Sequence, residues 1–212
     1  MTTVESPHPD DVQDRSRVVV LISGTGTLLA ALLAATAAVS HPVHIVAVGA
    51  DRPCSGLQHA VDAGVPTFTV ARSDHASRLE WDSALAAAVR AYEPDLVVLA
   101  GFMRVLGPGF LGGAPLVLNT HPSLLPSFPG AHAVADALAH GVRVSGVTVH
   151  VVDAGLDTGP ILAQQAVGVL EGDTEETLHE RIKVVERGLL VDVVSAVAVH
   201  GVTLDGRKAH IP

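Results

Sequence analysis

The chain of 212 residues is long enough for one domain with a sizeable buried core. Hydrophobic residues make up 48% and charged residues 17%, which excludes a disordered protein, and aromatic residues at 3% leave an aliphatic core. The formal net charge of −9 argues against nucleic acid as the main partner, because contacts with phosphates require a basic surface.

The N-terminal residues and the cysteine content indicate where the protein works. Residues 1–16 are polar and lack the apolar centre of a secretory signal, so we expect a disordered extension before a single domain over residues 17–212. The one cysteine, Cys54, cannot form an intrachain disulfide and fits a reducing compartment. The apolar segments are too short to cross a bilayer. We therefore expect a cytoplasmic protein without a membrane partner.

Apolar, β-branched runs alternate with alanine- and leucine-rich stretches in the first half of the chain. Strands are expected at residues 17–22, 43–50, 66–70 and 95–100, and helices at residues 27–39, 57–63 and 77–92. Strands that alternate with helices are joined by right-handed crossovers and form a largely parallel sheet. The sequence thus predicts an α/β fold, in which a mostly parallel twisted sheet carries helices on both faces.

The glycine-rich loop after the first expected strand is a candidate anion site. Free backbone N–H groups and the helix dipole both favour a phosphate at a helix N-terminus. Gly24 and Gly26 let the backbone approach a ligand closely, and Thr25 and Thr27 add hydroxyl donors. Leu29 occupies the place of the third glycine of a dinucleotide fingerprint, which weakens the case for a dinucleotide. We favour the phosphate of a small substrate over a plain tight turn.

The pattern changes in the second half of the chain. The apolar run at residues 116–118 is followed by expected strands at 147–152 and 161–169 and by one long helix at about 174–199. Residues 202–211 are expected to close the chain as a small hairpin or an extended tail.

An amide and an imidazole lie two residues apart directly after the run at residues 116–118. Side chains alternate along a strand, so Asn119 and His121 should project from the same face. Asp157 adds a carboxylate from a glycine-rich loop. An amide donor, a titratable ring and a carboxylate that meet at one carbonyl oxygen suit acyl chemistry. Ser123 has no obvious base–orienter pair, so we expect direct attack on the carbonyl carbon without a covalent enzyme intermediate.

Four sequence blocks, in order and at fitting separations, resemble the phosphoribosylglycinamide formyltransferases of the folate-dependent formyltransferase family. The blocks are residues 20–26, 100–106, 119–126 and 156–161. The resemblance implies a single-domain Rossmann-like sheet and a formyltransferase domain over residues 17–212. It also implies glycinamide ribonucleotide as acceptor in purine biosynthesis and 10-formyltetrahydrofolate as co-substrate.

The resemblance also assigns roles position by position. The catalytic positions are Asn119, His121 and Asp157. The ribonucleotide-binding positions are Gly24, Thr25, Gly26, Thr27, Leu28 and Glu186. The folate-binding positions are Arg78, Met103, Arg104, Val105, Leu106, Asp153 and Asp157. Apart from the resemblance, His132 follows the motif in the expected rim of the site, and His150 lies within an expected strand. Both are expected to support the catalytic positions, with a plain core histidine as the open alternative for His150. Family members commonly carry Asn at the position of Leu28, and leucine cannot hydrogen-bond a phosphate, so the backbone must make that contact.

Several alternatives remain open beside this interpretation. Methionyl-tRNA formyltransferase would need a further basic domain for tRNA, and formyltetrahydrofolate deformylase usually carries an N-terminal regulatory domain. Two alternatives come from a different class of protein, namely a nucleotide-binding Rossmann module and an NAD-dependent dehydrogenase. Asp51 supports them, because it follows the second expected strand, where a carboxylate could bind a ribose. The missing third glycine and the Asn119, His121 and Asp157 trio argue against them.

Metal ions and macromolecules are not among the expected partners. None of the 12 histidines pairs with cysteines or carboxylates at a spacing typical of metal ligands, so we expect no metal site. The expected partners are the two small-molecule substrates, without nucleic acid or membrane, and a homodimer is left open.

Overall fold

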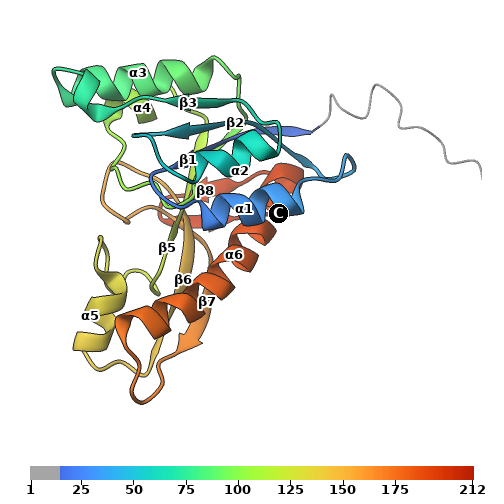
Figure 1. Ribbon diagram of the computed structural model, residues 1–212. Helices are drawn as coiled ribbons and strands as arrows, with labels where there is room; N and C mark the ends of the chain where they lie inside the picture. Colours follow the sequence, from blue (N-terminus) through green and yellow to red (C-terminus); the bar gives the residue numbers. More distant parts are fainter. Residues whose placement is uncertain (1–14) are drawn as a thin grey trace, which may run out of the picture.

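The computed structural model describes residues 15–212, which form one mixed sheet of nine strands in the order β3-β2-β1-β4-β5-β6-β7-β9-β8 (Figure 1). The parallel half contains β1 (Ser16–Ile22), β2 (Val43–Ala50), β3 (Thr67–Thr69), β4 (Leu96–Leu99) and β5 (Leu116–His121). The expected α/β fold with a mostly parallel sheet is therefore confirmed.

The antiparallel half begins where β5 pairs with β6. It contains β6 (Val144–Val151), β7 (Ile161–Gly168) and the closing hairpin of β8 (Thr203–Asp205) and β9 (Lys208–His210). The hairpin was one of the two expected forms of the C-terminal segment. The last strand, β9, runs parallel to β7 and meets it at Ile161 and Lys208.

The start of the domain differs from the expectation. Residues 1–14 of the expected extension lie outside the described residues, but Ser16 already opens β1 and pairs with Val43. The Arg15 guanidinium donates hydrogen bonds to the carbonyl groups of Thr36, His41 and Val43. An extension that includes residues 15 and 16 is therefore wrong, because both residues are held by the domain.

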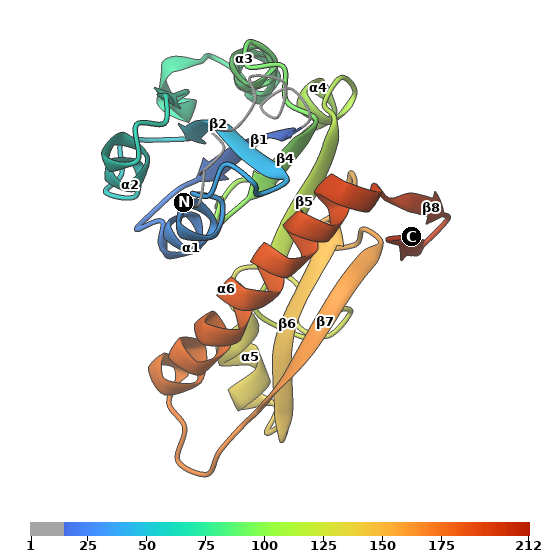
Figure 2. The same ribbon diagram turned by 90° about the vertical axis from the view of Figure 1, so that its right-hand side faces the viewer.

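Helices cover both faces of the sheet, as Figures 1 and 2 show. The helices are α1 (Thr27–Ala35), α2 (Leu57–Asp62), α3 (Arg78–Arg90), α4 (Pro108–Leu111), α5 (Ala133–Ala139) and α6 (Glu175–His200), with a 3₁₀ helix at Arg72–Asp74. The long α6 runs diagonally across β5, β6 and β7 in Figure 2. In the part of the chain that the structure describes, no helix combines the length and the apolar character needed to cross a bilayer.

The two larger apolar clusters of the core lie on opposite faces of the sheet, and a smaller third cluster contains Val134, Val147, Val167, Leu178 and Ile182. On β1, Val18, Val20 and Ile22 pack toward α1 and α6, whereas Val19 and Leu21 pack toward α3 and α4. All five side chains are at most 1% exposed. A central parallel strand is buried on both faces, which explains why β1 is apolar without interruption.

Some expected boundaries were wrong. The first helix ends at Ala35 rather than at residue 39, and the Thr36 hydroxyl bonds back to the Leu32 carbonyl there. The strand expected from residue 147 begins at Val144. Ser145 and Gly146 gave no strand signal because Ser145 is polar and Gly146 has no side chain, yet both residues are buried. The helices α4 and α5 were not expected, because four and seven residues are too few for a clear helical period.

Candidate active site

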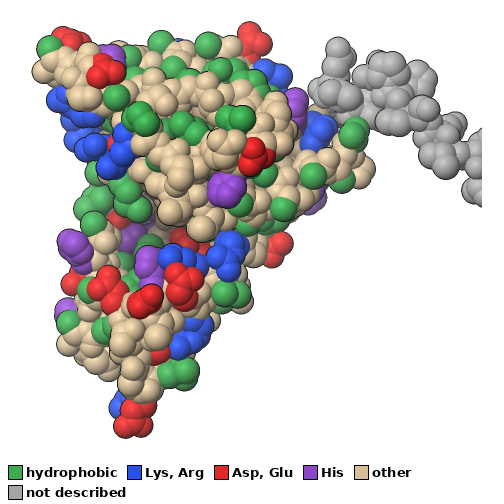
Figure 3. All heavy atoms as spheres, viewed as in Figure 1, with side chains coloured by type: hydrophobic (Ala, Val, Ile, Leu, Met, Phe, Trp, Pro, Cys, Tyr) green, Lys and Arg blue, Asp and Glu red, His purple; other side chains and the backbone are tan. Residues whose placement is uncertain are grey.

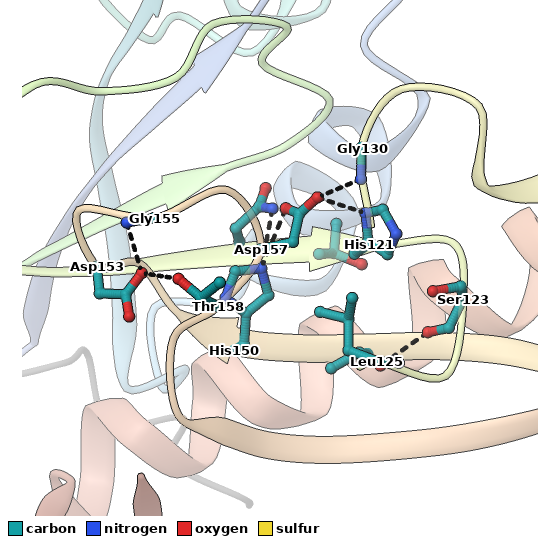
Figure 4. A network of polar contacts seen from close by, with 12 residues as sticks. His121, Ser123, Leu125, Gly130, His150, Asp153, Gly155, Asp157 and Thr158 are labelled. Carbon is teal, nitrogen blue, oxygen red and sulfur yellow. Dashed lines mark hydrogen bonds and ion pairs between the residues drawn. The ribbon is translucent and has the colours of Figure 1, made fainter. Parts of the chain in front are cut away.

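Asn119 and His121 project from β5 at the point where the sheet changes from parallel to antiparallel pairing. Asn119 lies opposite His150 and His121 lies opposite Thr148 on β6. Asp157 comes from the loop between β6 and β7 and lies between the rings of His121 and His150 (Figure 4). The three expected catalytic side chains are thus brought together.

The Asp157 carboxylate is held through Oδ2 and approaches His150 through Oδ1. Its Oδ2 accepts a hydrogen bond from the Gly130 backbone N–H at 2.8 Å and lies 3.4 Å from Nδ1 of His121. Its Oδ1 lies 3.8 Å from Nε2 of His150. The backbone at Asp157 is left-handed, with φ +53°, a conformation that a non-glycine residue adopts only when its surroundings hold it. The carboxylate therefore has a fixed direction toward the two rings.

The ring of His121 faces a hydrogen-bond acceptor at each nitrogen. Nε2 lies 2.8 Å from the Phe128 carbonyl oxygen, and Nδ1 faces Asp157. The side chain is buried, with 4% of its surface exposed. A ring that carries a hydrogen on both nitrogens would satisfy both acceptors.

Asn119 and His150 form a second pair beside the first. Nδ1 of His150 lies 3.0 Å from the Val151 carbonyl oxygen, so that nitrogen carries the hydrogen, and Nε2 accepts from the Asn119 amide at 3.1 Å. Burial lowers the pKa of His150 below its ordinary value, against the raising effects of the Val151 carbonyl and the Asp157 carboxylate. The ring is therefore neutral at pH 7, and the second amide hydrogen of Asn119 is left for another acceptor.

A clamp from β6 and β7 holds the segment that follows β5. The Thr148 hydroxyl accepts from the Leu125 N–H at 3.0 Å and donates to the Ser123 carbonyl at 2.7 Å. The Gln164 amide donates to both the Leu125 carbonyl and the Thr148 hydroxyl. Ser123 in turn donates to the Ser127 carbonyl at 2.6 Å, next to the Phe128 carbonyl that His121 contacts. The loop over His121 is thus anchored to the antiparallel half of the sheet.

The glycine loop between β1 and α1 has the features of an anion site. Gly26 has φ +72° and precedes α1 without any side chain that caps the free N–H groups of the first turn. A Cβ on Gly26 would lie 2.8 Å from Gly56 Cα, so only glycine fits there. Thr25 and Thr27 are exposed, whereas Leu28 is 7% exposed and packs in the core.

Glu186 reaches the sheet from α6, on the face opposite to Asn119. Its Oε1 accepts a hydrogen bond from the Thr120 hydroxyl at 3.0 Å, and the residue is 6% exposed. Burial raises the pKa of Glu186, while the hydrogen bond from Thr120 works against that rise. The carboxyl group therefore lies behind the strand that carries Asn119 and His121.

The segment expected to bind folate lies beside the glycine loop. The Met103 N–H donates to the Ser23 hydroxyl at 2.8 Å, and the Arg78 guanidinium donates to the Val105 carbonyl. Arg104 is engaged by Asp51 at 2.7 Å. Met103 and Val105 are largely exposed, but Leu106 is only 2% exposed.

Asp51 is not free to bind a ribose. It is 1% exposed, and Arg104 and Arg52 both pair with it. Burial alone would raise its pKa, but hydrogen bonds from Ser23, Arg104 and Arg52 hold the pKa below its ordinary value. This arrangement removes the sequence feature that favoured a dinucleotide-binding module.

An open cavity of about 460 Å³ lies on the same face of the sheet as Asn119. Apolar side chains of Leu111, Val117 and Val152 line it, and Asp153 lies in its wall. The Asp153 carboxylate accepts from the Gly155 N–H and the Thr158 hydroxyl, which braces the loop that carries Asp157. A flat apolar ring system with polar edges fits such a cavity.

The surface narrows between the part that contains α3 and the part that contains α5 (Figure 3). Histidine and charged side chains of both signs gather beside this narrowing. His132 is exposed at the N-terminal end of α5, and no hydrogen bond joins it to Asn119, His121 or Asp157 within residues 15–212. Among the described residues, no group of three or more histidine, cysteine, aspartate or glutamate side chains is arranged to hold a metal ion.

Comparison with known proteins decides the family. The family description "Formyl transferase" matches residues 16–194. The chain belongs to the formyl transferase family. The phosphoribosylglycinamide formyltransferase of Mycobacterium tuberculosis is 63% identical over 195 residues, which cover 92% of this chain and 90% of that protein.

Two further relatives agree with this assignment. The glycinamide ribonucleotide transformylase 1 of Symbiobacterium toebii superimposes with a TM-score of 0.90 at 43% identity and covers 93% of this chain and 94% of its own. The human trifunctional purine biosynthetic protein adenosine-3 is 41% identical over 186 residues, which cover 87% of this chain but 18% of that protein. The expected resemblance is confirmed.

Several groups in this formyl transferase site had no signal in the sequence. The Gly130 N–H and the Phe128 carbonyl are backbone groups, which every residue carries. The cavity residues Leu111 and Val117 belong to an unexpected helix and to a strand that was expected only for its apolar character. Val152 could have been found, because it directly precedes Asp153 in the loop that carries Asp157.

Proposed function

We propose that this formyl transferase moves the formyl group of 10-formyltetrahydrofolate to the primary amine of glycinamide ribonucleotide in purine biosynthesis. The observation that carries the proposal is the meeting of Asn119, His121 and Asp157 in a chain that is 63% identical to a phosphoribosylglycinamide formyltransferase. The acidic charge of −9 supports small molecules, rather than nucleic acid, as the partners. We place the protein in the cytoplasm, with residues 15–212 as the formyltransferase domain.

The two substrates would approach the end of β5 from different directions. The phosphate of the ribonucleotide would bind at the first turn of α1, where Gly24, Thr25, Gly26 and Thr27 offer N–H and hydroxyl donors. Leu28 would contribute its backbone N–H only, because its side chain is buried. Glu186, held beside Thr120, would take the ribose hydroxyls or the amine end.

The pterin ring of the folate would lie in the cavity beside Asn119. Leu111, Val117 and Val152 supply apolar contact surface there, and Asp153 and the backbone of residues 103–106 would meet its polar edge. Arg78 would stand at the mouth of the cleft, where its contact with the Val105 carbonyl holds it near this segment.

The chemical step is attack of the amine on the formyl carbon. A C–N bond forms to the amine, the formyl oxygen becomes an oxyanion, and the C–N10 bond then breaks. The free amide hydrogen of Asn119 would donate to the oxyanion, and cationic His121 would stabilise its charge and pass a proton toward N10. Asp157 would hold His121 and accept the proton that the amine releases, directly or through a water. His150 would support these groups through Asn119 without contacting the reacting atoms. The supporting role expected of His132 stays a prediction, since no hydrogen bond joins it to them within residues 15–212.

The test mixes the purified protein with 10-formyltetrahydrofolate and follows the folate product by absorbance, with and without glycinamide ribonucleotide. Product that forms only with the ribonucleotide is the expected result. Product without it would identify a deformylase instead, and a formyl-enzyme detected with the donor alone would contradict direct attack.

A further inference from the structure

The glycine loop supplies a phosphate with hydrogen bonds but with no full positive charge. No side chain caps the nine-residue α1, and its first turn holds Thr27, Leu28 and Leu29, none of which is charged. Leu28 points into the core. A phosphate dianion at this helix end would therefore meet backbone N–H groups, two threonine hydroxyls and the helix dipole.

His59 lies directly against this loop. The Gly56 N–H donates to the Gly24 carbonyl at 3.0 Å, which joins the start of α2 to the loop. A Cβ placed on Gly26 would lie 3.3 Å from Cδ2 of His59, the ring carbon bonded to Nε2. His59 is exposed, and within residues 15–212 its ring forms no hydrogen bond. Its ring nitrogens are thus available beside the open space at Gly24.

Three basic side chains on neighbouring segments are already engaged. Arg52 and Arg104 share the Asp51 carboxylate at 3.3 Å and 2.7 Å. Lys183 on α6 pairs with Glu180 at 2.7 Å. Imidazole is the side chain whose charge changes between pH 5 and 8, and it donates from both nitrogens when protonated. His59 is therefore the group best placed to add charge to the loop.

We infer that His59 binds the phosphate of the ribonucleotide and makes the glycine loop specific for a phosphorylated acceptor. The inference rests on the proposed function, because the phosphate belongs to the proposed acceptor. His59 contacts the substrate far from the formyl carbon, so it sets acceptor affinity and leaves the chemical step to Asn119, His121 and Asp157.

The experiment compares His59→Ala and His59→Lys with the wild type on glycinamide ribonucleotide and on glycinamide riboside, which lacks the phosphate. His59→Ala should raise the KM for the ribonucleotide roughly tenfold, since a hydrogen bond to a charged group is lost. It should leave kcat, the KM for folate and kcat/KM for the riboside unchanged. His59→Lys should restore a low KM for the ribonucleotide. The exposed His200, at the far end of α6, provides the matched control His200→Ala.

The affinity for inorganic phosphate, measured by calorimetry, tests the role of His59 independently of the proposed function. His59→Ala should weaken phosphate binding roughly tenfold whether or not the wild type turns over the ribonucleotide. An unchanged phosphate affinity, or equal losses with ribonucleotide and riboside, would overturn the role of His59. A wild type that binds phosphate through His59 but forms no ribonucleotide-dependent product would instead overturn the proposed function.

Discussion

Removal of the His150 ring tests whether that residue acts through Asn119. In His150→Leu the Asn119 amide loses the acceptor that lies 3.1 Å away, and a partly buried N–H is left without its partner. A net hydrogen bond contributes about 1 kcal/mol and an unsatisfied buried donor costs about 1–3 kcal/mol, so the amide will turn away to find another acceptor. We expect kcat to fall between about 5-fold and about 100-fold, since each 1.4 kcal/mol is a factor of ten.

The upper bound comes from Asn119 itself. Asn119→Ala removes the donor to the oxyanion and should lower kcat by about 10²–10³-fold. If His150 works only by directing Asn119, His150→Leu should add almost nothing in the Asn119→Ala background. His150→Gln, which places an amide oxygen near the former Nε2, should recover part of the loss.

The assay is the initial rate of folate product at saturating concentrations of both substrates, with each KM measured separately. The wild type, both single variants and the double variant form one cycle, and thermal unfolding of each confirms that it folds. Fully additive losses in kcat would refute the reasoning, because they would mean that His150 contributes independently of Asn119. A His150→Leu variant with unchanged kcat and a raised KM would refute it as well.

Four further changes probe the site and the core. Asp157→Asn should lower kcat by about 10²-fold with little change in either KM in steady-state kinetics. A raised KM at unchanged kcat would contradict the role of Asp157 in the chemical step. Ser145→Ala should raise the free energy of unfolding in urea by about 1 kcal/mol, because the buried hydroxyl has no partner within residues 15–212. Thr148→Val removes a clamp hydroxyl and should lower the free energy of unfolding by about 1–3 kcal/mol. Burial raises the pKa of Glu186, so its stabilising effect is complete below the unfolded pKa and is lost as pH rises through the folded pKa. Glu186→Gln should therefore gain stability over wild type at pH 7 and not at pH 4, unlike exposed Glu176→Gln.

Most of the first half of the fold was predictable because β1, β2 and β4 are buried on both faces. In an α/β chain, an uninterrupted apolar run such as β1 or β4 is typical of a central parallel strand. The start of β6 was predicted wrongly because Ser145 is polar and Gly146 has no side chain, although both residues are buried. Short helices such as α4 escaped because packing on the core, rather than local propensity, stabilises so few residues.

The candidate site was predictable where side chains carry it. The two-residue spacing of Asn119 and His121 predicts a shared face, and β5 has both residues on that face. The direction of the Asn119 amide and of the His121 ring was beyond the sequence, since the Val151 and Phe128 carbonyls and the Gly130 N–H set it. Those groups depend on the path of the backbone and not on residue type.

Because Asn119 pairs with His150, the function of the site depends on the number of residues in β6. Successive side chains of a strand point to opposite faces, so one residue inserted between Thr148 and His150 would turn the ring toward α6 and away from Asn119. The same insertion before Val144, in the connection from α5, would leave both rows of β6 side chains where they are. Related sequences can therefore vary in length at that connection. In contrast, β6 must keep its number of residues so that the Asn119 amide keeps its direction.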